Sequence, residues 1–490
     1  MDERIVIGVD LGTSGVRALA VRGDGRVAAT AQVGLESARR LDEGGRHEQD
    51  PRVWWELTAG VLRQLTAALA QAGLPAATWC GVAVDGTSGT LVCLDRSGAP
   101  VRHAIMYNDA RAGAEAESLN EQAADFCARL GYRFAASYAL AKLEWVRRHE
   151  PEMFARTAHC LHQGDYIEAC LVGDWGTSDY SNALKTGYDL LDNSWPAWLA
   201  NLAGVRERLP RVVAPGTAWG QVSVAAAAVT GLPVGLPVIA GATDGTAACL
   251  ASGVRRPGDY NTTLGTTLVF KGISQQLGRH AQGLVYSHKL PGGRWLPGAA
   301  SNTGGEWIET AFPGRDLAAL DQAAAALLPT ACLAYPLARQ GERFPFLAPA
   351  ASGFWLPPPA DEATRFAAGL QGTALIERLA YAVIDQVAGT AGGEVYSTGG
   401  GSRSAVWMQC RADATGRVIH RPAYPESAFG SAVLAAAGTL FGQPWDAVST
   451  MVRLDRSFPP QPQHRAAYDE LYSRFTAQLR ERGWIATEAG

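Results

Sequence analysis

Apolar residues at the start of the chain form strand patterns that are separated by short polar turns. Residues 6–9 are a continuous apolar run that ends at a carboxylate, Asp10. After a Gly-Thr-Ser-Gly turn, apolar residues alternate over 16–21, and a third strand pattern covers 26–33. Continuous runs are typical of buried strands, and alternation is typical of half-buried ones. The chain is therefore predicted to begin as strand, turn and strand.

Helical and strand patterns then alternate through the first half. Residues 51–72 form an amphipathic helix pattern, with Asp50 in the position of its N-cap. A buried strand is expected over 80–84, a polar turn over 85–90 and a second strand over 91–94. Further helices are expected over 110–124 and 139–149, and 178–198 has the polar, irregular character of a functional loop. This alternation indicates an α/β fold.

A stretch rich in Gly and Pro, residues 231–237, is the predicted domain boundary. Directly after it, 238–246 repeats the opening theme of an apolar strand, an acid (Asp244) and Gly-Thr. A hairpin is predicted over 259–271, and a strand at 394–397 leads into three glycines and a helix over 405–414. We therefore predict a duplicated fold with two domains, 1–235 and 236–490, facing a shared cleft.

Composition narrows the classes of function. The 490 residues include 47% apolar and 18% charged residues, which suits two folded domains. The net charge of −4 gives no electrostatic reason to expect a nucleic acid or a membrane surface as a partner. The eight cysteines contain no C-x-x-C pattern, so neither a zinc site nor a disulfide framework is expected. Scattered cysteines of this kind fit a protein in a reducing compartment. Without an apolar leader or an unbroken membrane-length run, the expected location is the cytoplasm.

The turn after Asp10 has the chemistry of a phosphate loop. Glycines let backbone N–H groups approach an anion, hydroxyls add donors, and a carboxylate at the strand end can hold water on Mg²⁺. The pattern is neither a Walker loop nor a Rossmann loop, because G-x-x-x-x-G-K-[ST] and a strand followed by G-x-G-x-x-G are both absent. An ordinary β-hairpin with a glycine-rich turn is the alternative.

Two acids at strand ends are what phosphoryl transfer to an alcohol requires. One helps to position Mg²⁺, and the other accepts the hydroxyl proton. Asp244 is the better candidate for the base, and Asp10 for holding the metal through water, with Asp244 as a second metal neighbour. The alternative is that Asp244 only caps a helix over 246–252.

Three further segments carry candidate chemistry. Four threonines around Gly265 look like a nest for the β- and γ-phosphates, although a Thr-rich hairpin has the same pattern. The glycines 399–401 could lie flat against a base or phosphate, or form a tight turn. Residues 106–111 place an amide, a carboxylate and a guanidinium together, which suits sugar hydroxyls or else a helix cap. No catalytic triad and no metal-binding histidine pair can be argued from spacing.

These segments resemble the FGGY family of carbohydrate kinases over essentially the whole chain. The motifs that carry the resemblance are the phosphate motif at 10–14, the sugar motif at 107–111, the first signature at 137–149, the catalytic-base motif at 241–244 and the adenosine motif at 399–404. The resemblance implies two ribonuclease-H-like domains of the actin, Hsp70 and sugar kinase superfamily around a central cleft. It further implies an N-terminal sugar-binding domain, a C-terminal ATP-binding domain, ATP and Mg²⁺ as cofactors, and Asp244 as the base.

The motifs and the resemblance together give two sets of candidate site residues. The sugar-binding set is Thr87, Ser88, Gly89, Asn108, Asp109, Lys185 and Asp244. The ATP-binding set is Asp10, Gly12, Thr13, Ser14, Arg17, Gly265, Thr266, Thr267, Gly304, Gly400, Gly401, Ser402 and Arg403.

The substrate is predicted from one departure within the family. Xylulokinases carry Gln-Met-His where this chain has Thr87-Ser88-Gly89. Residues 85–90 and 181–188 look more like the D-ribulose kinases of cyanobacteria and plants. We therefore expect ATP-dependent conversion of D-ribulose to D-ribulose 5-phosphate. A kinase for D-xylulose or another polyol is the alternative, as is a non-catalytic, nucleotide-regulated binding protein of the same fold, and a homodimer is left open.

Overall fold

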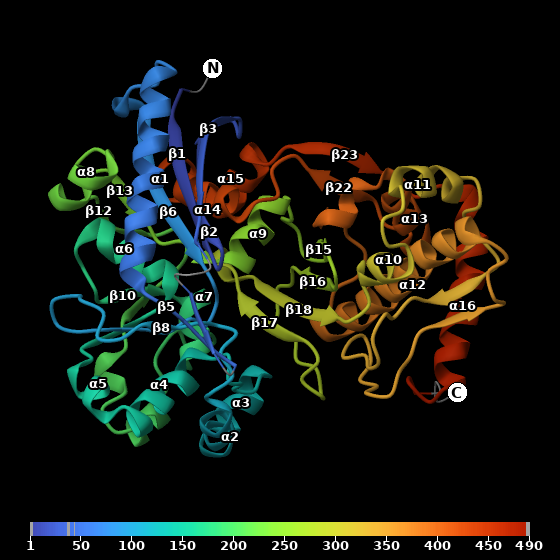
Figure 1. Cartoon of the computed structure of the whole chain (residues 1–490), viewed down its shortest axis with the longest axis horizontal. Helices are drawn as coiled ribbons and strands as arrows, with labels where there is room; N and C mark the ends of the chain where they lie inside the picture. Colours follow the sequence, from blue (N-terminus) through green and yellow to red (C-terminus); the bar gives the residue numbers. More distant parts are fainter. Residues whose placement is uncertain (1–2, 37–39, 44, 487–490) are drawn as a thin grey trace. The chain divides into compact units, whose positions relative to one another are not determined.

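The computed structural model describes residues 3–36, 40–43 and 45–486, which form two compact units (Figure 1). The first unit comprises Met1–Gly253, His288–Gly293 and Tyr424–Arg453. The second comprises Val254–Ser287, Arg294–Ala423 and Leu454–Gly490. Each unit is built around its own mixed β-sheet with helices against it.

The first sheet begins with the strand–turn–strand motif that the sequence predicts. Its strands run in the order β12-β13-β6-β1-β2-β3, and β14 also pairs with β6. The strands are antiparallel from β1 to β3, whereas β6 and β13 run parallel to β1. Their bounds are β1 (Ile5–Gly12), β2 (Gly15–Arg22), β3 (Val27–Gly34), β6 (Trp79–Gly86), β12 (Ala218–Gln221), β13 (Pro237–Ile239) and β14 (Ala242–Thr243).

Strand β1 is continuously apolar because both of its faces are buried. Ile5, Ile7 and Val9 pack in the core under α1 (Pro51–Gln71) and α6 (Gln163–Val172). Val6 faces the other core, beside α14 (Ser427–Ala436). At Gly8 an added Cβ would lie 1.9 Å from the carbonyl oxygen of Ala428, so only glycine lets α14 lie directly on the strand.

The remaining elements of the first unit surround this sheet. Its other helices are α2 (Gly113–Gln122), α3 (Ala124–Leu130), α4 (Ala139–His149), α5 (Pro151–Arg156), α7 (Tyr180–Ala183), α8 (Val224–Thr230), α9 (Asp244–Ser252) and α15 (Pro444–Met451). Small sheets join β4 (Arg40–Glu43), β5 (Arg46–Gln49) and β8 (Ala104–Ile105), then β7 (Val92–Leu94) and β9 (His159–Leu161), and finally β10 (Thr177–Asp179) and β11 (Arg211–Val213). The helix expected over 110–124 is thus two helices, α2 and α3, of which the second continues to Leu130.

The second unit repeats the same strand pattern. Its sheet runs β17-β18-β16-β15-β21-β22-β23, with β15, β16 and β18 antiparallel and β21 and β22 parallel to β15. The strands are β15 (Tyr260–Leu264), β16 (Leu268–Gly272), β17 (Tyr286–Lys289), β18 (Trp295–Ser301), β21 (Val395–Thr398), β22 (Ile419–Pro422) and β23 (Leu454–Phe458), and β19 (Leu333–Tyr335) pairs separately with β20 (Phe354–Leu356). The helices are α10 (Glu306–Ala311), α11 (Leu317–Ala325), α12 (Glu362–Ala388), α13 (Ala405–Thr415) and α16 (Arg465–Glu481).

The duplicated fold is present, but residues 238–246 do not open its second copy. The counterpart of β1 in the second unit is β15, which forms an antiparallel hairpin with β16 as β1 does with β2. Residues 238–243 instead belong to β13 and β14, which pair with β6 of the first sheet. For this reason the units divide between Gly253 and Val254 rather than at the Gly/Pro-rich stretch before residue 236.

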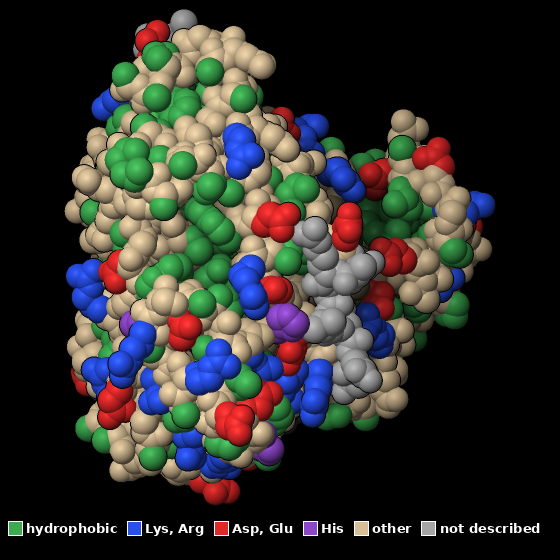
Figure 2. Space-filling view, turned by 60° about the vertical axis from the view of Figure 1, so that its left-hand side comes forward, with side chains coloured by type: hydrophobic (Ala, Val, Ile, Leu, Met, Phe, Trp, Pro, Cys, Tyr) green, Lys and Arg blue, Asp and Glu red, His purple; other side chains and the backbone are tan. Residues whose placement is uncertain are grey.

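The surface and the helices add two findings. Acidic and basic side chains are interspersed on the face shown in Figure 2, in keeping with the small net charge. Within the described residues, the helices lack an apolar stretch long enough to cross a bilayer.

Candidate active site

Three carboxylates meet at one end of the first sheet. Asp10 and Asp85 lie opposite each other in the parallel pairing of β1 with β6. Ala242 of β14 pairs with Asp85 on the other side, so Asp244 follows directly after the next parallel strand. Because the carboxyl ends of adjacent parallel strands form the usual ligand-binding edge of an α/β sheet, these acids mark the candidate active site.

The carboxylates influence one another strongly. Burial raises the pKa of Asp85 well above its usual range, and the nearby charge of Asp10 raises it further. Burial also raises the pKa of Asp10, where Asp244 adds to the rise while a hydrogen bond from Asp85 and the Arg17 guanidinium oppose it. The Ser431 hydroxyl of α14 donates to Asp85 at 2.6 Å. Asp85 is thus protonated more readily than an exposed aspartate, and its protonated form can donate a hydrogen bond to Asp10.

Asp244 is the first residue of α9 and not its cap. Thr243 occupies the N-cap position, and the Asp244 carboxylate accepts a hydrogen bond from the backbone N–H of Gly245 at 2.5 Å. The side chain is half-buried, at the positive end of the helix dipole. Asp10 and Asp244 lie in the same unit, which corrects the expectation that each domain supplies one acid.

A buried glutamate sets the position of the strand that leads to Asp244. Between the β13 and β14 pairings, one carboxylate oxygen of Glu168 accepts hydrogen bonds from Val84 N–H at 3.1 Å and Gly241 N–H at 2.8 Å. An added Cβ at Gly241 would lie 1.8 Å from the carbonyl oxygen of Val84. Glu168 therefore bridges the gap where the strands do not bond directly.

The predicted sugar loop, residues 87–90, follows Asp85 and Gly86 and is held from inside. Thr87 donates its backbone N–H and its hydroxyl to Gln163, at 2.9 and 2.6 Å. The Thr87 and Thr90 hydroxyls are 2.6 Å apart, and Thr90 accepts the N–H of Tyr107. Thr87 is buried and serves the shape of the loop rather than presenting its hydroxyl outward.

Two lysines fix the tip of the loop through its carbonyl groups. The Lys185 ammonium donates to the Ser88 carbonyl at 3.1 Å, and the buried Lys142 donates to the Gly89 carbonyl at 2.8 Å. Gly89 has a φ of +91°, and an added Cβ there would lie 2.4 Å from the Ser137 carbonyl oxygen. The Ser88 hydroxyl is enclosed and has no hydrogen-bond partner among the described atoms, so it is the group of this loop that remains for a ligand.

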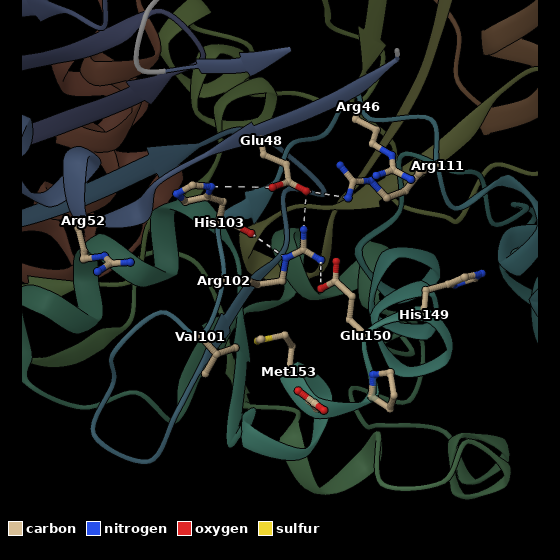
Figure 3. Close-up of a pocket in the computed structure, with 12 residues that line it drawn as sticks. Arg46, Glu48, Arg52, Val101, Arg102, His103, Arg111, His149, Glu150 and Met153 are labelled. Atoms are coloured by element: carbon tan, nitrogen blue, oxygen red, sulfur yellow. Dashed lines mark hydrogen bonds and ion pairs between the residues drawn. The ribbon is translucent and has the colours of Figure 1, made fainter. Parts of the chain in front are cut away.

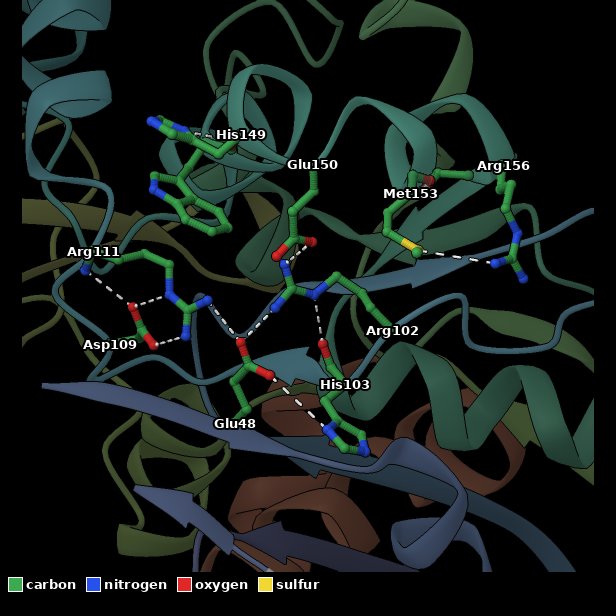
Figure 4. A network of polar contacts seen from close by, with 11 residues as sticks. Glu48, Arg102, His103, Asp109, Arg111, His149, Glu150, Met153 and Arg156 are labelled. Atoms are coloured by element: carbon green, nitrogen blue, oxygen red, sulfur yellow. Dashed lines mark hydrogen bonds and ion pairs between the residues drawn. The ribbon is translucent and has the colours of Figure 1, made fainter. Parts of the chain in front are cut away.

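Of the predicted sugar motif, Asp109 is fully engaged within the chain (Figure 4). Its carboxylate accepts the backbone N–H of His47 at 2.6 Å and three N–H groups of Arg111 at 2.7 to 3.0 Å. Burial opposes ionisation, but the hydrogen bonds from Arg111 outweigh it and lower the pKa of Asp109. The neighbouring Asn108 is exposed. Asp109 therefore holds β5 and the 106–111 segment in place, and Asn108 is the free polar side chain of the motif.

The turn between β1 and β2 carries Gly12, Thr13, Ser14 and Arg17. Its backbone is tied down from outside: Thr13 accepts from the Gln49 side chain at 3.2 Å and Ser14 from the N–H of Leu35 at 2.8 Å. Arg17 lies opposite Asp10 in the register of the hairpin and donates to Gln32 at 3.2 Å. The expected strand–turn–strand geometry is therefore present, with the guanidinium beside the first acid.

The second unit contains a cavity of about 580 Å³ where two predicted nucleotide segments meet. Gly265 and Thr266 line it from the β15–β16 turn, and Gly400, Gly401 and Arg403 line it from the glycine-rich turn after β21. Its remaining walls are mostly apolar, from Leu264, Ile308, Leu317, Phe366, Leu370 and Trp407. An apolar pocket of this size with a few polar groups at its edge suits a nucleotide base and ribose.

The other predicted nucleotide residues support the walls of this cavity. An added Cβ at Gly304 would lie 2.4 Å from the Thr266 carbonyl oxygen, so this glycine allows the chain to lie against the β15–β16 turn. Thr267 accepts the N–H of Gly265 at 3.1 Å. Ser402 donates to the Gly399 carbonyl at 2.6 Å and is buried, so it stabilises the turn from within. Gly265 does not have a positive φ, so its backbone conformation does not require glycine. The absence of a side chain there instead keeps space open in the cavity.

Several residues of the candidate site were missed from the sequence. Asp85 follows a buried strand as Asp10 does, and that repetition was the available signal. No local sequence signal marked Gln163, Glu168 or Ser431, because their hydrogen-bond partners are far away in the chain. The separations are 76 residues for Gln163, at least 73 for Glu168 and 346 for Ser431.

Two family models match most of the chain. Residues 5–251 match the N-terminal domain, and residues 261–439 the C-terminal domain, of the FGGY family of carbohydrate kinases. The chain belongs to this family. It is therefore a phosphotransferase that acts on a carbohydrate, in two domains of the actin, Hsp70 and sugar kinase superfamily, and membership implies the use of ATP.

Individual relatives of this FGGY kinase differ in the substrates that their names give. A xylulose kinase structure from Rhodospirillum rubrum has a TM-score of 0.85 and 31% identity, covering 98% of this chain and 99% of that one. An autoinducer-2 kinase from Klebsiella pneumoniae subsp. pneumoniae is 30% identical, covering 96% of this chain and 92% of its own length. A xylulose kinase from Staphylococcus epidermidis is 25% identical and covers 97% of both chains.

Proposed function

We propose that this FGGY kinase transfers the γ-phosphoryl group of ATP to O5 of D-ribulose. The observation that carries the choice of substrate is the 87–90 loop: a serine hydroxyl without a partner and a glycine of positive φ occupy the place where xylulokinases have a bulky Met-His pair. A pocket wall made by Ser88 and Gly89 leaves more room, and offers a different donor, to the sugar hydroxyls.

In the proposed step, Asp244 is the catalytic base. Its carboxylate accepts the proton of the C5 hydroxyl as that oxygen forms a bond to the γ-phosphorus and the bond from phosphorus to the ADP oxygen breaks. Asp10 and Asp244 provide the hard oxygen ligands that Mg²⁺ prefers, directly or through water. Bound Mg²⁺ would neutralise charge on the phosphate oxygens.

Discrimination between the two ketoses rests on one hydroxyl. D-Ribulose and D-xylulose differ in configuration at C3, and a polar group that loses its partner costs about 1–3 kcal/mol, roughly a tenfold to hundredfold change in kcat/KM. Ser88, Asn108 and Lys185 are the polar side chains of the first unit that we assign to the sugar, with Thr87 and Asp109 as their supports. We expect D-ribulose to be preferred by about tenfold or more.

A coupled ADP-release assay tests the proposal directly. The acceptors are D-ribulose, D-xylulose, ribitol, glycerol, sedoheptulose and autoinducer-2, with the Asp244→Asn variant as the control for contaminating kinases. The highest kcat/KM with D-ribulose supports the assignment. A tenfold preference for D-xylulose or autoinducer-2 contradicts the substrate but keeps the kinase, and ATP turnover that no acceptor stimulates would favour a nucleotide-regulated binding protein.

A further inference from the structure

Two cysteines face each other across a small buried sheet of the first unit. Strands β7 and β9 are antiparallel, and their register pairs Cys93 with Cys160. The two residues are 1% and 3% exposed, and both are free thiols. No other two cysteines are directly opposite in the described strand pairs.

The hydrogen bonds around this pair show which kind of antiparallel pair it is. The Cys93 carbonyl accepts the N–H of Val101, on the side of the strand away from β9, and Leu91 exchanges both of its bonds with Ile105 on that same side. The Leu94 carbonyl, one residue on, accepts the N–H of Ala158 beside β9. Cys93 and Cys160 are therefore a non-hydrogen-bonded pair, whose Cα atoms are typically about 4.5 Å apart, within the range of about 4.4–6.8 Å that a disulfide spans.

The two thiols act on each other's ionisation, and a different arginine lies near each of them. The Cys160 thiol donates a hydrogen bond to the Cys93 sulfur, which lowers the pKa of Cys93 against the effect of burial, and the Arg102 guanidinium acts in the same direction. The same hydrogen bond raises the pKa of Cys160. The lowered pKa of Cys93 favours it over Cys160 as the attacking thiol.

A cavity of about 680 Å³ is lined by the two residues that follow Pro100, one of which bonds to the Cys93 backbone (Figure 3). Val101, whose N–H bonds to Cys93, and Arg102 both line it, together with Glu48, Glu150 and Met153. Arg102 is held there by Glu48 and Glu150, each at 2.5 Å, as Figure 4 shows. Arg102, whose guanidinium charge acts on the Cys93 thiol, thus lines a cavity that a small polar oxidant can enter.

We propose that Cys93 and Cys160 are a site of reversible disulfide formation, driven by a small two-electron oxidant such as hydrogen peroxide. The Cys93 thiolate attacks one peroxide oxygen, which gives a sulfenic acid and, with one proton, water. The Cys160 sulfur then attacks the sulfenic sulfur, the S–O bond breaks, and a second water leaves with the Cys160 proton. In total, two thiols lose two protons and two electrons, and one peroxide becomes two waters.

The folded full-length protein is exposed to hydrogen peroxide, the remaining thiols are alkylated, and peptides are mapped by mass spectrometry. We expect a linked Cys93–Cys160 peptide, lighter by two hydrogens, which dithiothreitol converts back to two thiols. Cys170 is the matched control: it is more exposed, but burial of its thiol raises its pKa to about 12. The linked peptide should form at least about tenfold faster than any oxidised form of Cys170, and Cys170→Ala should leave it unchanged.

Two variants test the order of attack. In Cys160→Ala, Cys93 should stop at the sulfenic acid and be labelled by dimedone, whereas in Cys93→Ala no label should appear at position 160. The wild-type measurement does not require either variant to fold, and it does not depend on kinase activity. A negative result would therefore count against the disulfide and not against the proposed kinase function. The proposal is overturned if Cys93 and Cys160 stay reduced in protein of native circular dichroism while Cys170 is oxidised.

Discussion

At the scale of single residues, the chemistry of the site depends on how three neighbouring carboxylates divide protons. Asp85 is enclosed, and burial and the charge of Asp10 raise its pKa well above the usual range although the hydrogen bond from Ser431 opposes the rise. Asp244 is bonded to Gly245 at the start of α9 and, like Asp10, is half-buried. The raised pKa of Asp85 favours its protonated form, which reduces the repulsion among the three carboxylates.

Replacing Asp244 by Asn removes the proposed base with little change in volume. We expect turnover with the best ketose to fall by about 10²–10⁴-fold, because that is the usual contribution of a general base. Steady-state kinetics, with nucleotide affinity from titration calorimetry, measure the two effects. Nucleotide affinity should be retained, since the nucleotide cavity is formed by residues of the second unit. Turnover near the wild-type rate in a folded variant would rule out the role of Asp244.

Glu168 gives a prediction about pH. Burial raises the pKa of its carboxyl well above the ordinary value, with the Asp165 charge adding to the rise. As pH rises, the folded protein therefore keeps a proton on Glu168 that the unfolded chain loses at about pH 4.3. The contribution of Glu168 to stability is full below that pH and is lost as pH rises toward the pKa of the folded state. The loss is up to about 1.4 kcal/mol per pH unit.

Glu168→Gln keeps an acceptor oxygen for Val84 and Gly241 but cannot ionise. Its free energy of unfolding relative to wild type should increase with pH over that window and level off above the folded pKa. Urea titrations at a series of pH values measure this difference. If the difference in free energy of unfolding between variant and wild type does not change from about pH 4 to about pH 8, Glu168 is ionised to the same extent in the folded and unfolded states.

At the scale of elements, close packing between α9 and α14 places Asp244. Gly430 of α14 allows this approach, because an added Cβ would lie 1.9 Å from the carbonyl oxygen of Ala247 in α9. Helix α14 also lies on β1 and supplies Ser431 to Asp85. One helix from late in the chain thus supports two of the three carboxylates.

Gly430→Ala should therefore move α9 and impair both stability and turnover. We expect a loss of about 1–3 kcal/mol in the free energy of unfolding, as for other overpacked cores, and a lower kcat with the best ketose. The matched control is Gly60→Ala in α1, where an added Cβ meets nothing within 4 Å. Removing a helix-interior glycine there should stabilise by up to about 1 kcal/mol. Equal effects of the two substitutions in denaturant titrations would show that the α9–α14 contact is not specific.

How far the sequence predicts this molecule also depends on scale. Local patterns predict β1, β2, α4 and the glycine turns well, because periodicity and turn residues act within a few positions. They could not assign residues 238–243 to the correct unit, because the local sequence of a strand followed by an acid is the same in either unit. Only the pairing of these residues with β6 shows that they belong to the first unit. Likewise, the hydrogen bond that Asp109 accepts from the N–H of His47, 62 residues away, leaves no local sign in the motif.

At the scale of the whole molecule, each unit has its own core, and the proposal assigns the sugar to the first unit and the nucleotide cavity to the second. The cores of the first unit lie on the two faces of its sheet, and the aromatic core of the second surrounds α12 and the sheet that ends in the glycine turns. Tyr424–Arg453 returns to the first unit before Leu454–Gly490 completes the second, so both units are complete only when most of the chain has been made.

This division of labour predicts that the two ligands protect different amides from hydrogen exchange. A ligand present at about 100 times its Kd stabilises its bound state by about 2.7 kcal/mol, which can slow exchange through local opening by up to about a hundredfold. D-Ribulose alone should slow exchange in the first unit, around residues 87–90 and 182–187. A non-hydrolysable ATP analogue should slow it in the second, around 264–267, 304–308 and 399–404. Exchange detected by mass spectrometry locates each effect, and Asp244→Asn allows both ligands to be added together without turnover. Protection of the 399–404 turn by the ketose alone, with no effect of the nucleotide there, would contradict the assignment of the second-unit cavity to ATP.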